Sequence, residues 1–176
     1  MKKHFALIFG FFSAFVFAQE SVNPAIKSLG TVSTVPDATV VPDPTLEYKI
    51  VVDVMSGGED HSEVFFSMNN VARMINLHAM AGVPKEKLDV VVAIHNAAIW
   101  ASLNDEAHQK RFGVVNPHTG LIKELVDYGV KVVVCGQSLV KREIPKEMLI
   151  PGIEVAASAL TTITTYQLKG YALLRF

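Results

Sequence analysis

Three short runs of apolar, mostly β-branched residues dominate this chain, at residues 48–55, 88–94 and 130–135. A nearly continuous apolar run is typical of a parallel strand whose two faces are both covered. Between the runs, apolar residues recur at helical spacing, most clearly over residues 62–80. Strands that alternate with helices in this way predict βαβ units and a mostly parallel sheet.

Two shorter segments, 152–155 and 171–175, complete the predicted sheet. We therefore predict a Rossmann-like α/β fold of three layers, with a mostly parallel sheet of about five strands flanked by helices. The helix over residues 62–80 is expected to start with a capping box, because Asp60 is followed three residues later by Glu63. Further helices are predicted at residues 97–103, from Pro117 to Gly129, and at residues 157–168.

The first residues have the pattern of a secretory signal. Lys2 and Lys3 precede an apolar run over residues 5–17, and small side chains lead to Ala18, after which we predict cleavage. The run is shorter than the roughly 20 residues that span a bilayer, and no later segment is long and apolar enough to be a membrane helix. We therefore expect no membrane span once residues 1–18 are removed. The protein is therefore predicted to be periplasmic or secreted.

Residues 19–46 differ in composition from the rest of the chain. Prolines within this stretch exclude a regular helix, so we predict an extended Pro-rich arm that precedes a single α/β domain over residues 47–176. The formal net charge is −1, and removal of the basic signal makes the chain more acidic. No basic cluster remains, which predicts that nucleic acid is not a partner.

Polar residues follow three of the predicted strands. Ser56 follows the first strand, His95 and Asn96 follow the second, and Cys135 ends the third. The carboxyl ends of parallel strands lie at one edge of the sheet, where open α/β sheets bind their ligands. We therefore expect these residues to line one pocket.

Cys135 is the only cysteine, so no intramolecular disulfide can form. If a helix begins directly after it, the next three backbone N–H groups stabilise a thiolate, and two basic residues further on add positive charge. The residues concerned are Gly136, Gln137, Ser138, Lys141 and Arg142. The alternative is a buried, unreactive thiol that packs as a small hydrophobic side chain among valines. The sequence leaves both interpretations open.

Metal and dithiol chemistry are not indicated. No two histidines have a metal-ligand spacing such as i and i+4, so we predict no metal site. Dithiol exchange needs a second cysteine to resolve the mixed disulfide, and the chain has none.

The cysteine lies in the segment Val-Cys-Gly-Gln-Ser, residues 134–138, directly after a predicted buried strand. Together with residues 35–38, 42–44, 48–54 and 169–172, this segment resembles the secreted branch of the DsrE/DsrF-like family, small Rossmann-related proteins of sulfur metabolism. The resemblance implies homo-oligomers, as trimers or hexamers. It also implies that the cysteine after this strand carries a persulfide between protein partners.

Two functional hypotheses follow. In the first, the chain is an exported sulfur carrier that exchanges a sulfane sulfur bound to Cys135 with a donor or acceptor protein and needs no other cofactor. Gln137 and Ser138 then position the sulfur, and His95 and Asn96 line the same pocket. In the alternative, the chain is a non-catalytic oligomeric module that binds a small ligand or a protein, and its cysteine is structural. Alkylation of the native thiol distinguishes the two.

Overall fold

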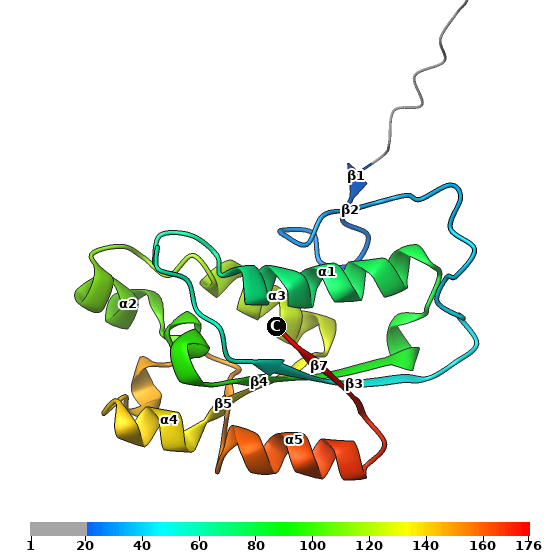
Figure 1. Ribbon diagram of the computed structural model, residues 1–176. Coiled ribbons are helices and arrows are strands. Elements are labelled where there is room, and N and C mark those ends of the chain that lie inside the picture. The colour runs from blue at the N-terminus through cyan, green and yellow to red at the C-terminus, as the bar shows by residue number, and fades with distance from the viewer. Residues whose placement is uncertain (1–20) are drawn as a thin grey trace, which may run out of the picture.

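The computed structural model describes residues 21–176, and the predicted signal peptide lies outside this range. Its centre is a five-stranded sheet in the order β6-β5-β4-β3-β7, and all neighbouring strands are parallel (Figure 1). The predicted fold class is therefore confirmed. The strands are β3 (Tyr48–Val54), β4 (Leu88–Ile94), β5 (Lys131–Cys135), β6 (Glu154–Ala156) and β7 (Ala172–Arg175).

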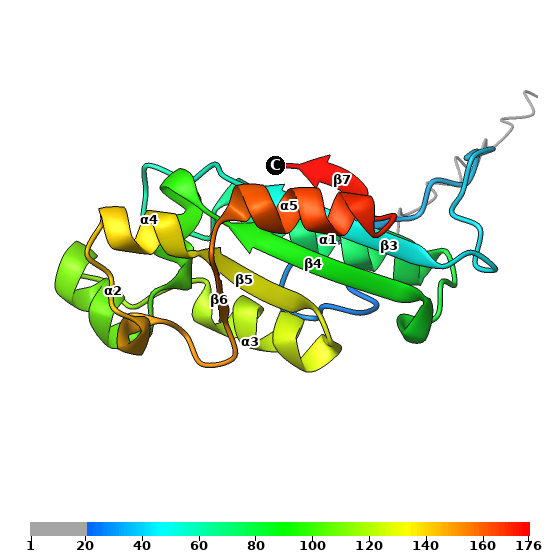
Figure 2. The ribbon, with the colours of Figure 1, turned by 90° about the horizontal axis from the view of Figure 1, so that it is seen from below.

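Helices cover both faces of this sheet. The α-helices are α1 (Phe66–Met80), α2 (Asp105–Phe112), α3 (Thr119–Tyr128), α4 (Gly136–Lys141) and α5 (Ala159–Leu168), and the 3-10 helices are η1 (Lys85–Lys87), η2 (Asn96–Ser102) and η3 (Lys146–Met148). Figures 1 and 2 show α1 and α3 on one face and α4 and α5 on the other. Among the helices of residues 21–176, none is long and apolar enough to cross a membrane.

Alternation of side chains along the strands explains the continuous apolar runs. On β3, Val52 and Val54 belong to the core that is shared with α1 and α3. Val51 points to the opposite face, where it packs in a second, smaller core with Ala159 of α5. Cys135 belongs to this second core. Because both faces of the sheet are covered, apolar residues are required at successive positions of each strand.

Helix α1 begins at Phe66, later than predicted, and the predicted capping box is wrong. The Asp60 carboxylate instead accepts hydrogen bonds from the backbone N–H and the hydroxyl of Ser62, at 2.7 and 2.6 Å, and closes a turn in the preceding loop. The N-cap residue is Phe65, whose N–H donates to Nε2 of the buried His118 at 2.9 Å. A tertiary contact therefore accompanies the helix start.

The connection between β4 and β5 differs most from the prediction. The helix expected at residues 97–103 is the 3-10 helix η2. Helix α2 was not predicted. Its N-cap, Asn104, accepts a hydrogen bond from the N–H of Ala107 at 2.9 Å, and Gly113 ends it in the left-handed conformation. Helix α3 starts two residues after Pro117 rather than at that proline.

The first half of the Pro-rich arm packs against the domain. Two short antiparallel strands, β1 (Ser21–Val22) and β2 (Val32–Ser33), close a loop in which Ile26 is completely buried. Further along, Val40 and Val41 are exposed. The apolar residues of the arm therefore divide into a docked group and a solvent-facing group.

Candidate functional site

Two of the predicted site residues meet at the carboxyl edge of the sheet. Cys135 is the last residue of β5, and His95 directly follows β4. The register pairs Ile94 with Val134, so His95 and Cys135 occupy the next pair of positions. Neighbouring strands lie about 4.8 Å apart, and side chains at matched positions share a face of the sheet. The two residues therefore occupy neighbouring positions on the α5 side of this edge.

The thiol lies where two helices begin. Helix α4 starts at Gly136, and α5 starts at Ala159 on the same face. Burial raises the pKa of the Cys135 thiol, and hydrogen-bond donors from both helices lower it by more, so that the pKa is below its ordinary value. These donors are the N–H of Ala159, the N–H and hydroxyl of Ser138, and the N–H of Gln137. The Cys135 side chain makes no capping hydrogen bond at the start of α4.

Gly136 allows α4 to start close to the neighbouring edge strand. A Cβ atom at this position would lie 2.7 Å from the carbonyl oxygen of Ala156, the last residue of β6. Any larger residue would therefore push the first turn of α4 away from the sheet. Glycine at this position keeps the donors of that turn beside Cys135.

A buried carboxylate that the sequence reasoning missed lies next to His95. The Asp53 side chain is only 3% exposed, and its Oδ1 atom lies 2.6 Å from His95 Nε2. Its other oxygen, Oδ2, accepts a hydrogen bond from Nε of Arg175 on β7 at 2.8 Å. An isolated buried charge is strongly unfavourable, and these two partners satisfy both carboxylate oxygens. The only signal in the sequence is an aspartate between valines near the end of a mostly apolar strand.

Three further predicted residues join this site. The Ser138 hydroxyl accepts a hydrogen bond from the Asn96 N–H at 3.4 Å, which ties the end of β4 to the start of α4. Asn96 itself has a positive φ of 49°, an uncommon conformation that directs the chain into η2. The exposed Gln137 side chain donates to the carbonyl oxygen of Ala157 at 3.4 Å and so joins α4 to the residues that precede α5.

The other three predicted residues lie further away. Lys141 is exposed in the last turn of α4, and the Arg142 guanidinium lies over the Trp100 ring, 5.6 Å from its centroid. Neither charge is among the causes that lower the pKa of the Cys135 thiol. The carbonyl oxygen of Ser56 accepts a hydrogen bond from the Ser67 hydroxyl at 2.6 Å, which turns the chain towards α1 on the opposite face.

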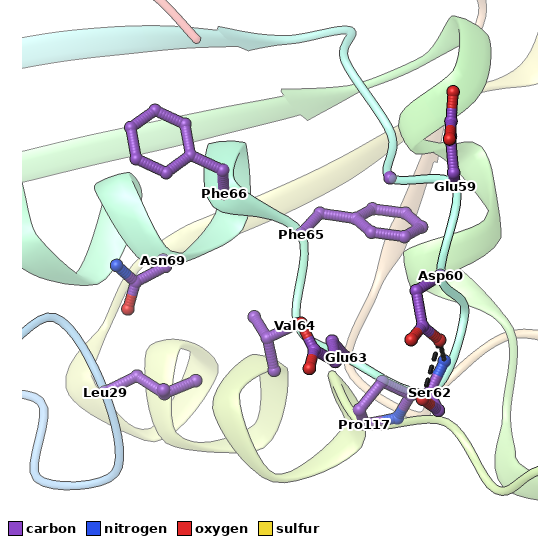
Figure 3. A pocket seen from close by; sticks show the side chains of 11 residues that line it. Leu29, Glu59, Asp60, Ser62, Glu63, Val64, Phe65, Phe66, Asn69 and Pro117 are labelled. Atoms are coloured by element: carbon purple, nitrogen blue, oxygen red, sulfur yellow. Dashed lines mark hydrogen bonds between the residues drawn. The ribbon is translucent and has the colours of Figure 1, made fainter.

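One sizeable cavity does not coincide with the thiol. It has a volume of about 700 Å³ and lies between the loop before α1, α1 itself and the docked arm (Figure 3). Figure 3 shows Phe65 and Phe66 at its wall and Asp60 turned towards Ser62. A second hollow of about 610 Å³ begins at Gly136 and runs between α4 and β6, with a mostly apolar lining. This second hollow reaches Gly136, the residue directly after Cys135, and Cys135 itself does not line it.

Within residues 21–176, no three histidine, cysteine, aspartate or glutamate side chains are grouped so that they could hold a metal ion. The strand-end site offers a thiol, an imidazole and backbone N–H groups. Such a set can stabilise a sulfur anion and exchange a proton with it.

Comparison with known proteins places these features in context. The model of the DsrE/DsrF-like family matches residues 49–176. Among solved structures, the chain is similar to the protein of unknown function MTH1491 from Methanobacterium thermoautotrophicum, with a TM-score of 0.56 and 22% identity over 73% of this chain and 99% of that one. It is also similar to the ychN protein from E. coli, with a TM-score of 0.51 and 20% identity over the same shares. Both likenesses concern the fold. No curated protein matches the chain.

Proposed function

This chain belongs to the DsrE/DsrF-like family, and from that premise we propose that it is an exported sulfur carrier. Cys135 accepts a sulfane sulfur, holds it as a persulfide and passes it to a thiol acceptor. The family match supports a role of the sulfur-relay type. The observation that carries the finer proposal is the position of this single thiol between the starts of α4 and α5, where backbone N–H groups favour its anion.

The chemistry of loading requires no redox partner. The Cys135 thiolate attacks the outer sulfur of a donor persulfide or polysulfide. One S–S bond forms at Cys135, the corresponding S–S bond of the donor breaks, and the shortened donor leaves as a thiolate. The terminal sulfur on Cys135 is itself anionic when deprotonated, so the N–H groups that favour the thiolate also favour the loaded form.

Incubation of the native protein with inorganic polysulfide is expected to add sulfur to Cys135. Intact-mass measurement should show a gain of one or more sulfur atoms that a reducing agent removes, and peptide mapping should place the gain on Cys135. Alkylated protein and the Cys135→Ser variant should show none. Because there is no other cysteine, sulfur that persists after alkylation would contradict the proposal.

Export and self-association belong to the same proposal. We expect a signal peptide, residues 1–18, to be removed after Ala18, so that protein recovered from the periplasm or the medium starts at Gln19. A recovered chain that retains residues 1–18 contradicts export.

We also propose that the domain forms a homo-oligomer, a trimer or a hexamer, that meets its sulfur donor and acceptor proteins. Light scattering of the purified protein measures this, and a monomer contradicts it.

A second function is favoured by the burial of the thiol. Cys135 is only 6% exposed, and the adjoining hollow between α4 and β6 carries Val140, which is 77% exposed. These features also suit a non-catalytic module that binds a small ligand or a protein at this hollow, with Cys135 as a packed core residue. In that case the native thiol stays unmodified by an alkylating reagent until the protein unfolds.

A further inference from the structure

Four polar side chains form a row at the carboxyl edge of the sheet, at the ends of four adjacent strands. In the order β7-β3-β4-β5 they are Arg175, Asp53, His95 and Cys135. The first three are joined by hydrogen bonds of 2.8 and 2.6 Å, both to the Asp53 carboxylate. The row therefore links a surface guanidinium to the neighbourhood of the thiol through a carboxylate that is almost completely buried.

The Asp53 carboxylate determines which nitrogen of His95 carries the proton. An ionised carboxylate only accepts hydrogen bonds, so Nε2 must be the donor, and in the neutral ring Nδ1 is then a free acceptor. Across residues 21–176, His95 Nδ1 has no hydrogen-bond partner. The His95 side chain is 19% exposed, so this nitrogen belongs to a side chain that is partly open to solvent and stands beside the position of Cys135.

We propose, on the basis of the persulfide-carrier function, that His95 takes the proton of the Cys135 thiol through Nδ1. Asp53 is the positioning residue that holds the imidazole in the required tautomer, and Arg175 holds Asp53. A buried carboxylate is costly to maintain, and its two partners alone give no reason for its presence in the buried part of β3, where its neighbours are valines. Orientation of a proton-accepting imidazole beside a nucleophile gives that reason.

The proton and the electrons balance over one transfer. His95 Nδ1 takes the thiol proton, and the Cys135 thiolate attacks the outer sulfur of a donor persulfide, R–S–SH. The new S–S bond forms on Cys135 while the donor S–S bond breaks, and the leaving R–S⁻ takes the proton from His95. The products are the Cys135 persulfide and the thiol R–SH, so no oxidant or reductant is consumed.

Few other charges surround this pair. Asp53 faces His95 from β3, and Arg175 faces Asp53 from β7. Helix α5 contributes no acidic residue in its first turn, and α4 carries its basic residue, Lys141, in its last turn. Burial and the hydrogen-bond donors of the two helices set the pKa of the thiol, and the proposal adds His95 as the group that accepts its proton.

The rate of Cys135 alkylation by a neutral reagent, followed by intact mass from pH 5 to pH 9, tests the proposal. In His95→Gln we expect alkylation at pH 7 to slow by about tenfold and its rise to move to higher pH. Asp53→Asn, which keeps the shape of the side chain, should shift the profile in the same direction. The matched control is His78→Gln, on α1 at the opposite face, which should leave the profile unchanged.

The alkylation profile of His95→Gln alone tests the role of His95, even if Asp53→Asn does not fold. A His95→Gln profile that superimposes on the wild type overturns the proton-transfer role of His95. Polysulfide loading of the same samples separates this from the underlying function. If His95→Gln takes up sulfur from polysulfide and its alkylation profile is unchanged, the protein is a sulfur carrier that does not use His95. If the His95→Gln profile is shifted but the wild-type protein takes up no sulfur, the carrier function is contradicted and the role of His95 towards the thiol is not.

Discussion

At pH 5 the folded protein is expected to be about 2 kcal/mol less stable than at pH 7 because of one side chain, His118. Its ring is completely buried and satisfied in the neutral form, since Nε2 accepts the Phe65 N–H at 2.9 Å and Nδ1 lies 2.8 Å from Asn116 Oδ1. Burial, and then the charges of His108 and His61, lower the pKa of His118 to about 3. Protonation would turn the acceptor at Nε2 into a donor that faces another donor.

The direction of the effect follows from proton binding. The unfolded chain takes up a proton near pH 6.5 and the folded chain only near pH 3. Stability therefore falls as the pH is lowered from 6.5 towards 3, and this contribution is constant above that window. Urea unfolding at pH 7 and pH 5 measures it. His118→Gln should remove this part of the pH dependence, and His78→Gln should keep it. The same pH dependence in the wild type and in His118→Gln would contradict the assignment.

Replacement of Asn76 by alanine is expected to lower the free energy of unfolding by at least about 3 kcal/mol and to release the arm. Asn76 Oδ1 accepts hydrogen bonds from the N–H groups of Ala25 and Ile26 at 2.9 and 2.8 Å. Its Nδ2 donates to the carbonyl oxygens of Ile26, Leu29 and Gly30, each at 3.0 Å. One fully buried side chain therefore satisfies five backbone groups of the arm, and each group left without a partner costs roughly 1–3 kcal/mol.

A neighbouring amide on the same helix provides the control. Asn70 lies on α1 and is half-buried, and its side chain makes no hydrogen bond within the described range, so Asn70→Ala should change the stability by less than about 0.5 kcal/mol. Urea unfolding gives the two free energies, and limited proteolysis reports the state of residues 21–34. If Asn76→Ala and Asn70→Ala are equally resistant to urea and to protease, the Asn76 amide does not hold the arm.

The sheet could be predicted from the sequence because its signal is local and repeated. The runs at β3, β4 and β5 are apolar on both faces, and this pattern occurs almost only in covered parallel strands. Cys135 could be placed at a strand end for the same reason, and the following Gly-Gln-Ser does begin α4. Helix α2 was missed because most of its residues are charged or polar and give no apolar stripe.

The other parts of the site depend on strand register and on contacts between residues far apart in the sequence, which the sequence pattern does not reveal. Asp53 becomes a partner of His95 only because β3 lies beside β4, and Arg175 joins them only because β7 adds next to β3. Asp60 has the spacing of a helix cap, yet its carboxylate closes a loop turn with Ser62. The arm is docked mainly by Asn76 of α1, together with Asn69 of α1 and Glu124 of α3, and nothing in the local sequence marks these residues.

The most direct test of the account is the ultraviolet absorbance of the Cys135 thiolate as a function of pH. Subtraction of the Cys135→Ser titration removes the tyrosine signal, and the single cysteine makes the assignment unambiguous. We expect the thiolate of the folded protein to appear at lower pH than that of the urea-unfolded protein, because the pKa of Cys135 is lowered by N–H groups of α4 and α5. A folded-state thiolate that appears only at higher pH than in the unfolded protein would mean that burial dominates and that Cys135 is a packed core residue rather than a sulfur acceptor.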